Sequence, residues 1–69
     1  MEMQFVDSSN IDRVGYDSGS GTLRIEFKSG GTYDYYDVPE MVFENLKNAP
    51  SVGRYHALEI KNRYAYNRI

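Results

Sequence analysis

The stretch LRIEFKSGGTYDYY, residues 23–36, decides the fold. In its first half Leu23, Ile25 and Phe27 alternate with charged side chains, and this period of two predicts a half-buried β-strand. The second half, TYDYY, is β-branched and aromatic, which strands favour. The KSGG segment between the halves is typical of a turn, because glycine adopts positive φ without steric cost. The stretch therefore predicts an antiparallel hairpin with one apolar face.

The same pattern continues upstream of the hairpin. Val14 and Tyr16 share one face of a shorter strand, and the DSGSG segment after Tyr16 is a second strand-to-strand turn. The three strands together are predicted to form an antiparallel meander. Residues 1–7 are expected to be a flexible lead-in.

The period changes after residue 36, and two helices are predicted. Pro39 at a first helical position, with Asp37 and Glu40 as nearby acids, begins the first helix, and the residue before Pro50 ends it. Ser51 is a good N-cap for the second helix. The apolar faces consist of Val42, Phe43, Leu46 and Ala49 in the first helix, and Val52, His56, Ile60 and Tyr64 (or Arg63) in the second.

The sheet and the helices each have one apolar side, and each can bury it only against the other. The predicted fold class is therefore α+β: a three-stranded antiparallel meander packed by two C-terminal helices, in the order β-β-β-α-α and in two layers. Residues 1–69 make one domain. Glu59 and Arg63 are spaced for an i, i+4 ion pair, and residues 64–69 are expected to be extended and to add a short edge segment.

Composition excludes several classes of protein. A chain of 69 residues buries only about 60% of its unfolded surface, so it is marginally stable alone and self-association is a reasonable expectation. The chain has no Cys, which excludes disulfides, thiolate zinc sites and thiol nucleophiles. No apolar run approaches the roughly 20 residues that span a bilayer, and the N-terminus lacks the features of a signal peptide. We expect a cytoplasmic protein with no membrane contact.

No pattern of catalytic, metal-binding or cofactor-binding residues is present. The two glycine-rich segments join strand to strand, whereas a phosphate-binding loop leads from a strand into a helix. His56 is the only imidazole, and its place on an apolar stripe indicates a packed, hydrogen-bonded residue at the edge of the core. An enzyme would need a second titratable group within hydrogen-bond reach of His56 in a cleft. We therefore predict a non-enzymatic protein with no metal and no cofactor.

Charge is distributed unevenly along the chain. Residues 1–46 carry three basic and nine acidic side chains, a net of −6. Residues 47–69 carry five basic side chains and one acidic, a net of +4, within an overall charge of −2. The basic third is suited to meet phosphates, or to complement the acidic part of the same fold.

Seven tyrosines are the compositional excess, and strand parity and helix spacing divide all of them except Tyr64. Tyr16, Tyr33 and Tyr35 are predicted to be scaffold. The residues predicted to contact RNA are the free tyrosines and their basic neighbours: Tyr36, Tyr55, Tyr66, Arg54, Lys61, Arg63 and Arg68. Rings stack on single-stranded bases and basic groups meet phosphates. The same side chains also suit an interface with another protein or a second copy of the chain, which is the alternative function.

Seven short motifs follow one another in a distinctive order: SSNI at 8–11, VGYD at 14–17, LxIxFxxG at 23–30, YxY at 33–35, VP at 38–39, AxSxG at 49–53 and IxxxYxY at 60–66. Together they resemble the KTSC domain over residues 8–68. That domain is found at the C-terminus of some lysyl-tRNA synthetases and as free-standing small bacterial or phage proteins, and we expect the free-standing form. The resemblance implies weak RNA or tRNA contact and no established catalytic residues. His56 departs from the pattern, because a Phe is typical after Tyr55.

Overall fold

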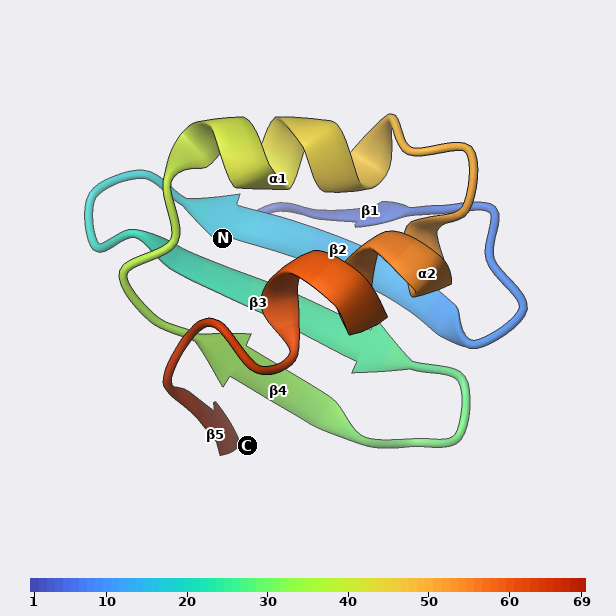
Figure 1. Cartoon of the computed structure of the whole chain (residues 1–69). Coiled ribbons are helices and arrows are strands. Elements are labelled where there is room, and N and C mark those ends of the chain that lie inside the picture. Colours follow the sequence, from blue (N-terminus) through green and yellow to red (C-terminus); the bar gives the residue numbers. More distant parts are fainter.

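The computed structural model describes residues 1–69 as a sheet layer and a helix layer (Figure 1). The strands are β1 (Met3–Phe5), β2 (Ile11–Asp17), β3 (Thr22–Phe27), β4 (Thr32–Tyr35) and β5 (Tyr66–Arg68). The helices are α1 (Glu40–Lys47) and α2 (Val52–Tyr55), and α2 runs directly into a π-helical turn, His56–Ile60. The α+β class and the two helices near the C-terminus are confirmed.

The prediction of a three-stranded sheet is wrong. The sheet has five antiparallel strands in the order β1-β2-β3-β4-β5, and the predicted meander is its centre. Met3–Phe5, within the expected lead-in, forms the edge strand β1 against β2. The expected edge segment in the tail is β5, which pairs with β4. Both additional strands have three residues, too few for an alternating pattern to be recognised.

Register places the apolar residues of neighbouring strands opposite one another. Leu23 pairs with Tyr35 and Ile25 with Tyr33, all on the face that the helices cover. The core is made of the buried apolar residues Ile11, Val14, Leu23, Ile25, Tyr35, Val38, Phe43, Leu46, Val52 and Ile60. Both layers contribute to it, as a two-layer fold requires.

The first helix begins one residue later than expected. Pro39 is the N-cap rather than the first helical residue, and Glu40 is the acid of the first turn. Asp37 has a φ of 57°, so it belongs to the turn before the helix and is not a helix-start acid. Phe43 and Leu46 bury the inner face of α1, and Phe43 stacks on Tyr16 with ring centroids 5.4 Å apart.

The second helix follows the predicted stripe. Ser51 Oγ accepts a hydrogen bond from the Arg54 N–H at 3.3 Å, which confirms the N-cap. Val52, His56 and Ile60 are buried at four-residue intervals, also as predicted. After His56 the helix widens, and the Lys61 N–H donates to the His56 carbonyl at 2.9 Å. Turns of the π type are rare and frequently occur at functional sites.

The outer face of the sheet carries two ion pairs between neighbouring strands. Arg24 donates two hydrogen bonds to the Asp34 carboxylate, at 2.8 and 3.0 Å, and Asp34 is only 7% exposed. The hydrogen bonds to Asp34 raise the pKa of Arg24 above its usual value. Arg13 and Glu26 form a similar pair at 2.8 Å in a more exposed setting.

Replacing Arg24 should therefore cost more than replacing Arg13. Arg24→Ala leaves the buried Asp34 carboxylate without its partner, and we expect a loss of about 2 kcal/mol in the free energy of unfolding. Arg13→Ala, the matched control, should cost less than about 1 kcal/mol. Urea unfolding of both variants measures the difference, and equal losses would contradict this account of Asp34.

Candidate functional site

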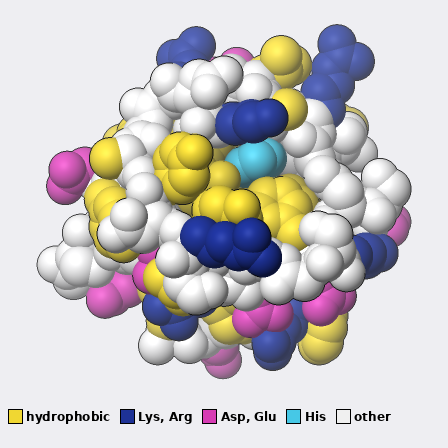
Figure 2. All heavy atoms as spheres, turned by 90° about the horizontal axis from the view of Figure 1, so that it is seen from below, with side chains coloured by type: hydrophobic (Ala, Val, Ile, Leu, Met, Phe, Trp, Pro, Cys, Tyr) yellow, Lys and Arg dark blue, Asp and Glu magenta, His cyan; other side chains and the backbone are white.

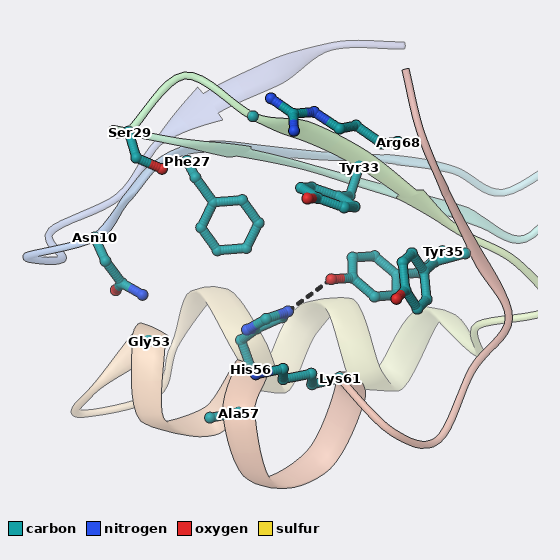
Figure 3. Close-up of a pocket in the computed structure, with 12 residues that line it drawn as sticks. Asn10, Phe27, Ser29, Tyr33, Tyr35, Gly53, His56, Ala57, Lys61 and Arg68 are labelled. Carbon is teal, nitrogen blue, oxygen red and sulfur yellow. Dashed lines mark hydrogen bonds between the residues drawn. The ribbon is translucent and has the colours of Figure 1, made fainter.

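A cavity of about 420 Å³ lies between the sheet and the second helix (Figure 3). We name it the aromatic cavity, and the residues that line it are Asn10, Phe27, Ser29, Gly31, Tyr33, Tyr35, Gly53, His56, Ala57, Lys61, Tyr66 and Arg68. They come from both layers and from segments far apart in the sequence. No carboxylate is among them.

Aromatic rings form one wall of the cavity. Phe27 meets Tyr33 edge to face with centroids 5.7 Å apart, and it meets the His56 ring at 5.2 Å. Tyr66 on β5 lies 5.8 Å from Tyr33 and 5.6 Å from Tyr35. Tyr66 is 53% exposed, so it is the ring of this group that is most open to a ligand. Figure 3 shows Phe27 projecting from the sheet toward the helix and His56 projecting from the helix toward the sheet.

One hydrogen bond joins the two layers at the back of the cavity. The Tyr35 hydroxyl lies 2.8 Å from His56 Nε2, and the two residues are 4% and 6% exposed. Burial, followed by the proximity of Tyr33 and Tyr66, raises the pKa of Tyr35 to about 12. Burial, and to a smaller extent the charge of Lys61, lowers the pKa of His56. The pair is therefore neutral at pH 7.

Two cations flank the cavity. Arg68 lies over the Tyr33 ring, 5.9 Å from its centroid, and Lys61 follows the π-helical turn. Neither of them takes part in any of the four ion pairs of the protein. Figure 2 shows the histidine surrounded by hydrophobic side chains, with basic side chains on both sides. The face is therefore positively charged although the whole chain is not.

Two glycines of the lining let other side chains approach the backbone. A Cβ at Gly53 would lie 2.3 Å from Asn10 Oδ1, which is not possible without displacing Asn10. A Cβ at Gly31 would lie 3.0 Å from the Tyr33 ring and 3.7 Å from the Arg68 guanidinium. Gly53 lies in the first turn of α2, and its missing side chain leaves the space that Asn10 occupies.

A sequence profile of the KTSC domain matches residues 7–64, most of the chain. The chain belongs to the KTSC domain family.

Relatives of this KTSC domain fall into two groups. A protein of Tsukamurella paurometabola is 44% identical over 62 residues, which are 90% of this chain and 92% of the relative. A lysine–tRNA ligase of Trichormus variabilis is 41% identical over 63 residues, which are 91% of this chain but 11% of the ligase. The chain thus spans about a tenth of the length of the lysine–tRNA ligases that it matches. The crystal structure of a KTSC domain protein from Yersinia pestis has a TM-score of 0.95 and 38% identity, and covers 99% of this chain and 96% of its own.

The aromatic cavity brings together three of the seven residues that the sequence indicated, Lys61, Tyr66 and Arg68. The other four lie outside its lining. Arg54 lines a second, more polar cavity of about 540 Å³ around residues 7–10 and 50–54. Arg63 lies 3.8 Å from Glu59 in the predicted i, i+4 pair. Tyr36 is half-buried and its hydroxyl is 3.4 Å from the Asn67 amide, and Tyr55 packs against the core.

Four aromatic residues of the lining are predicted from sequence to be scaffold: Phe27, Tyr33, Tyr35 and His56. Tyr35 and His56 are indeed buried, and the predicted hydrogen bond of His56 is confirmed. What the sequence did not show is that the same rings also border a cavity. Tyr35 is moreover a second titratable group within hydrogen-bond reach of His56, the arrangement that an enzyme would need. The signal available was Gly53, a glycine in the first turn of the predicted second helix.

Two other kinds of feature, a metal site and a membrane-spanning helix, are not found in the structure. No three His, Cys, Asp or Glu side chains lie close enough together to hold a metal ion. None of the helices has the length and hydropathy needed to cross a membrane.

His56→Phe should flatten the dependence of stability on pH. Because the pKa of His56 is lowered in the folded protein, the unfolded chain takes up the proton first as the pH falls below 6.5. The stability associated with the neutral imidazole is thus complete above that value and is lost as the pH falls toward the lowered pKa. Urea unfolding at about pH 7.5 and about pH 5.5 should show a larger loss for the wild type than for the variant. Titration of the carboxylates contributes equally to both proteins, because their carboxylates are the same. Equal losses of unfolding free energy in the wild type and the variant would therefore contradict a neutral, buried His56.

Proposed function

We propose that this KTSC domain is a non-enzymatic binding module that contacts RNA weakly through the face around the aromatic cavity. One observation carries the proposal: three tyrosine rings and two unpaired cations border a single cavity in which there is no carboxylate. Aromatic rings with neighbouring basic groups suit an unstacked strand, because every base has a face that can stack. Lys61, Tyr66 and Arg68 are the proposed centre of the contact.

The relatives support RNA as the ligand class by association. Proteins named lysine–tRNA ligase contain a segment similar to nearly all of this chain. A shared domain does not by itself transfer a function, so the argument depends on the chemistry of the cavity. The ligase activity belongs to those much longer proteins.

The Tyr35–His56 pair suits binding better than proton transfer. A general acid or base works best when its pKa lies near the working pH. The pKa of Tyr35 is raised to about 12, and no carboxylate lines the cavity to orient or assist His56. The hydrogen bond therefore acts as a structural link that also presents polar groups to the cavity.

Fluorescence anisotropy with labelled tRNA and single-stranded RNA tests the proposal. We expect micromolar or weaker affinity that falls steeply between about 50 and 200 mM salt, because phosphate contacts release counterions. Arg68→Ala should weaken binding and reduce the slope of log K against log salt by about 0.7. Arg13→Ala removes the same charge from the outer face of the sheet and is the matched control. Absence of binding at low salt would refute the RNA proposal.

Self-association is the second candidate, and the open edges of the sheet favour it. Strands β1 and β5 each have one unpaired side, and Phe5 on β1 is 77% exposed. Contact with another protein would use the same edges.

Light scattering at several protein concentrations separates the two candidates. If the RNA proposal holds, we expect the mass to stay near the 8.0 kDa of one chain. A stable species of twice that mass, which Phe5→Lys converts to monomer, would favour self-association. Gln4→Lys, on the same strand, controls for the added charge.

A further inference from the structure

We propose that the aromatic cavity is a subsite for one unstacked nucleobase, whose phosphate lies against Lys61 and Arg68. The inference rests on the proposed RNA contact and specifies how it is made. If the rings served only as an exposed stacking surface, a base would lie on the outside of the protein. The geometry points instead to insertion of a base between the sheet and the second helix.

The shape of the cavity fits a planar ligand. Its volume of about 420 Å³ lies within the range of about 300–1,000 Å³ that is usual for small-molecule sites. Figure 3 shows an open space with Phe27 and Tyr33 on the sheet side and Gly53 and Ala57 on the helix side. On the helix side His56 and Lys61 border the space, and between them and Asn10 the small residues Gly53 and Ala57 leave room, whereas the sheet side is lined with rings. A flat ring system is able to slide along the aromatic wall without displacing a large group.

The back of the cavity offers paired polar groups to the edge of a base. The Tyr35 hydroxyl and His56 Nε2 bond to each other, and neither has another partner in the protein. If Tyr35 donates, the imidazole Nδ1–H and a phenol lone pair remain free. If His56 donates, the phenol proton and the Nδ1 lone pair remain free. The pair therefore keeps one donor and one acceptor in either tautomer.

The second imidazole nitrogen is accessible from the cavity. No buried side-chain nitrogen or oxygen of the protein lacks a hydrogen-bond partner. His56 Nδ1 has no such partner, so it is not fully enclosed, and His56 is a lining residue. The edges of all four bases combine donors and acceptors, which is how unstacked bases are read by proteins. A purely apolar ligand would leave these groups unpaired.

The charge of the rim adds a requirement for an anion. Lys61 and Arg68 have no ion-pair partner, and the lining has no carboxylate to repel a phosphate. Arg68 also lies over the Tyr33 ring, so its guanidinium is held at the mouth of the cavity. The cavity thus offers three features to a ligand: an aromatic wall, a polar pair at the back and two cations at the rim. A nucleotide matches them with a planar base, the hydrogen-bonding edge of that base and a phosphate.

Single-stranded RNA and an abasic oligomer of the same length and charge separate base insertion from charge attraction. We expect the RNA to bind at least about tenfold more tightly, because stacking contributes roughly that factor or more per base. In NMR titrations the amides of Gly31, Gly53 and Ala57 and the His56 ring should shift with RNA and with uridine monophosphate. Inorganic phosphate should not shift the ring.

Two matched variants locate the contact. His56→Phe keeps an aromatic ring and should reduce the affinity for RNA about fivefold or more, because the polar pair is lost. Arg68→Ala should weaken binding of uridine monophosphate, whereas Arg13→Ala, on the outer face of the sheet, should not. The amide spectra of the unbound variants establish that each one is folded.

The possible failures are distinguishable. Equal affinity for RNA and the abasic oligomer, without shifts at the cavity, would overturn base insertion and leave the RNA proposal intact. Binding of uridine monophosphate at the cavity without binding of RNA would overturn the RNA proposal and assign the site to free nucleotides. Binding of none of these probes would overturn both.

Discussion

Two short helices cover only part of the inner face of a five-stranded sheet, and the rest of the structure depends on how the remaining part is buried. The central residues Leu23 and Ile25 are fully enclosed beneath the helix layer. Toward β4 and β5 the helix layer ends, and aromatic side chains bury one another instead. His56 lies at this boundary, because it belongs to the helix layer and its ring packs against Phe27 and Tyr35 of the sheet. Its hydrogen bond to Tyr35 holds the two layers together at the back of the cavity.

Local patterns were sufficient to predict the centre of the fold. Alternation in β3, the glycine turns and the Ser51 cap are all properties of neighbouring residues, and each was predicted from sequence. The strand β1 was missed, because three residues carry almost no period, and β5 was expected only as an edge segment, because its pairing with β4 depends on residues far away in the chain. Asp37 was misassigned for a related reason, since Asp is favoured both in turns and at the start of helices.

The candidate site is predicted only in part, because the sequence pattern divides six of the seven tyrosines into buried and free. In a domain of 69 residues the same ring can do both. Tyr33 packs edge to face on Phe27 and also lines the cavity, and Tyr35 is buried yet presents its hydroxyl there. The sequence alone identifies which side chains are basic. Only the fold shows that Lys61 and Arg68 line the aromatic cavity and that Arg54 does not. Their convergence depends on the pairing of β5 with β4, which no local pattern encodes.

Two lining residues of the cavity lie on the last strand, which is short and at the edge of the sheet. Tyr66 and Arg68 lie on β5, an exposed strand of three residues that is held by β4 and by the hydrogen bond from the Ile69 N–H to the Thr32 carbonyl. Terminal edge strands open at a small fraction of the free energy of global unfolding. Fraying of β5 would remove one aromatic and one cationic wall of the cavity at the same moment. Occupancy of the cavity and order of the C-terminus are therefore thermodynamically linked, and a bound ligand would slow amide hydrogen exchange in the strand that encloses it.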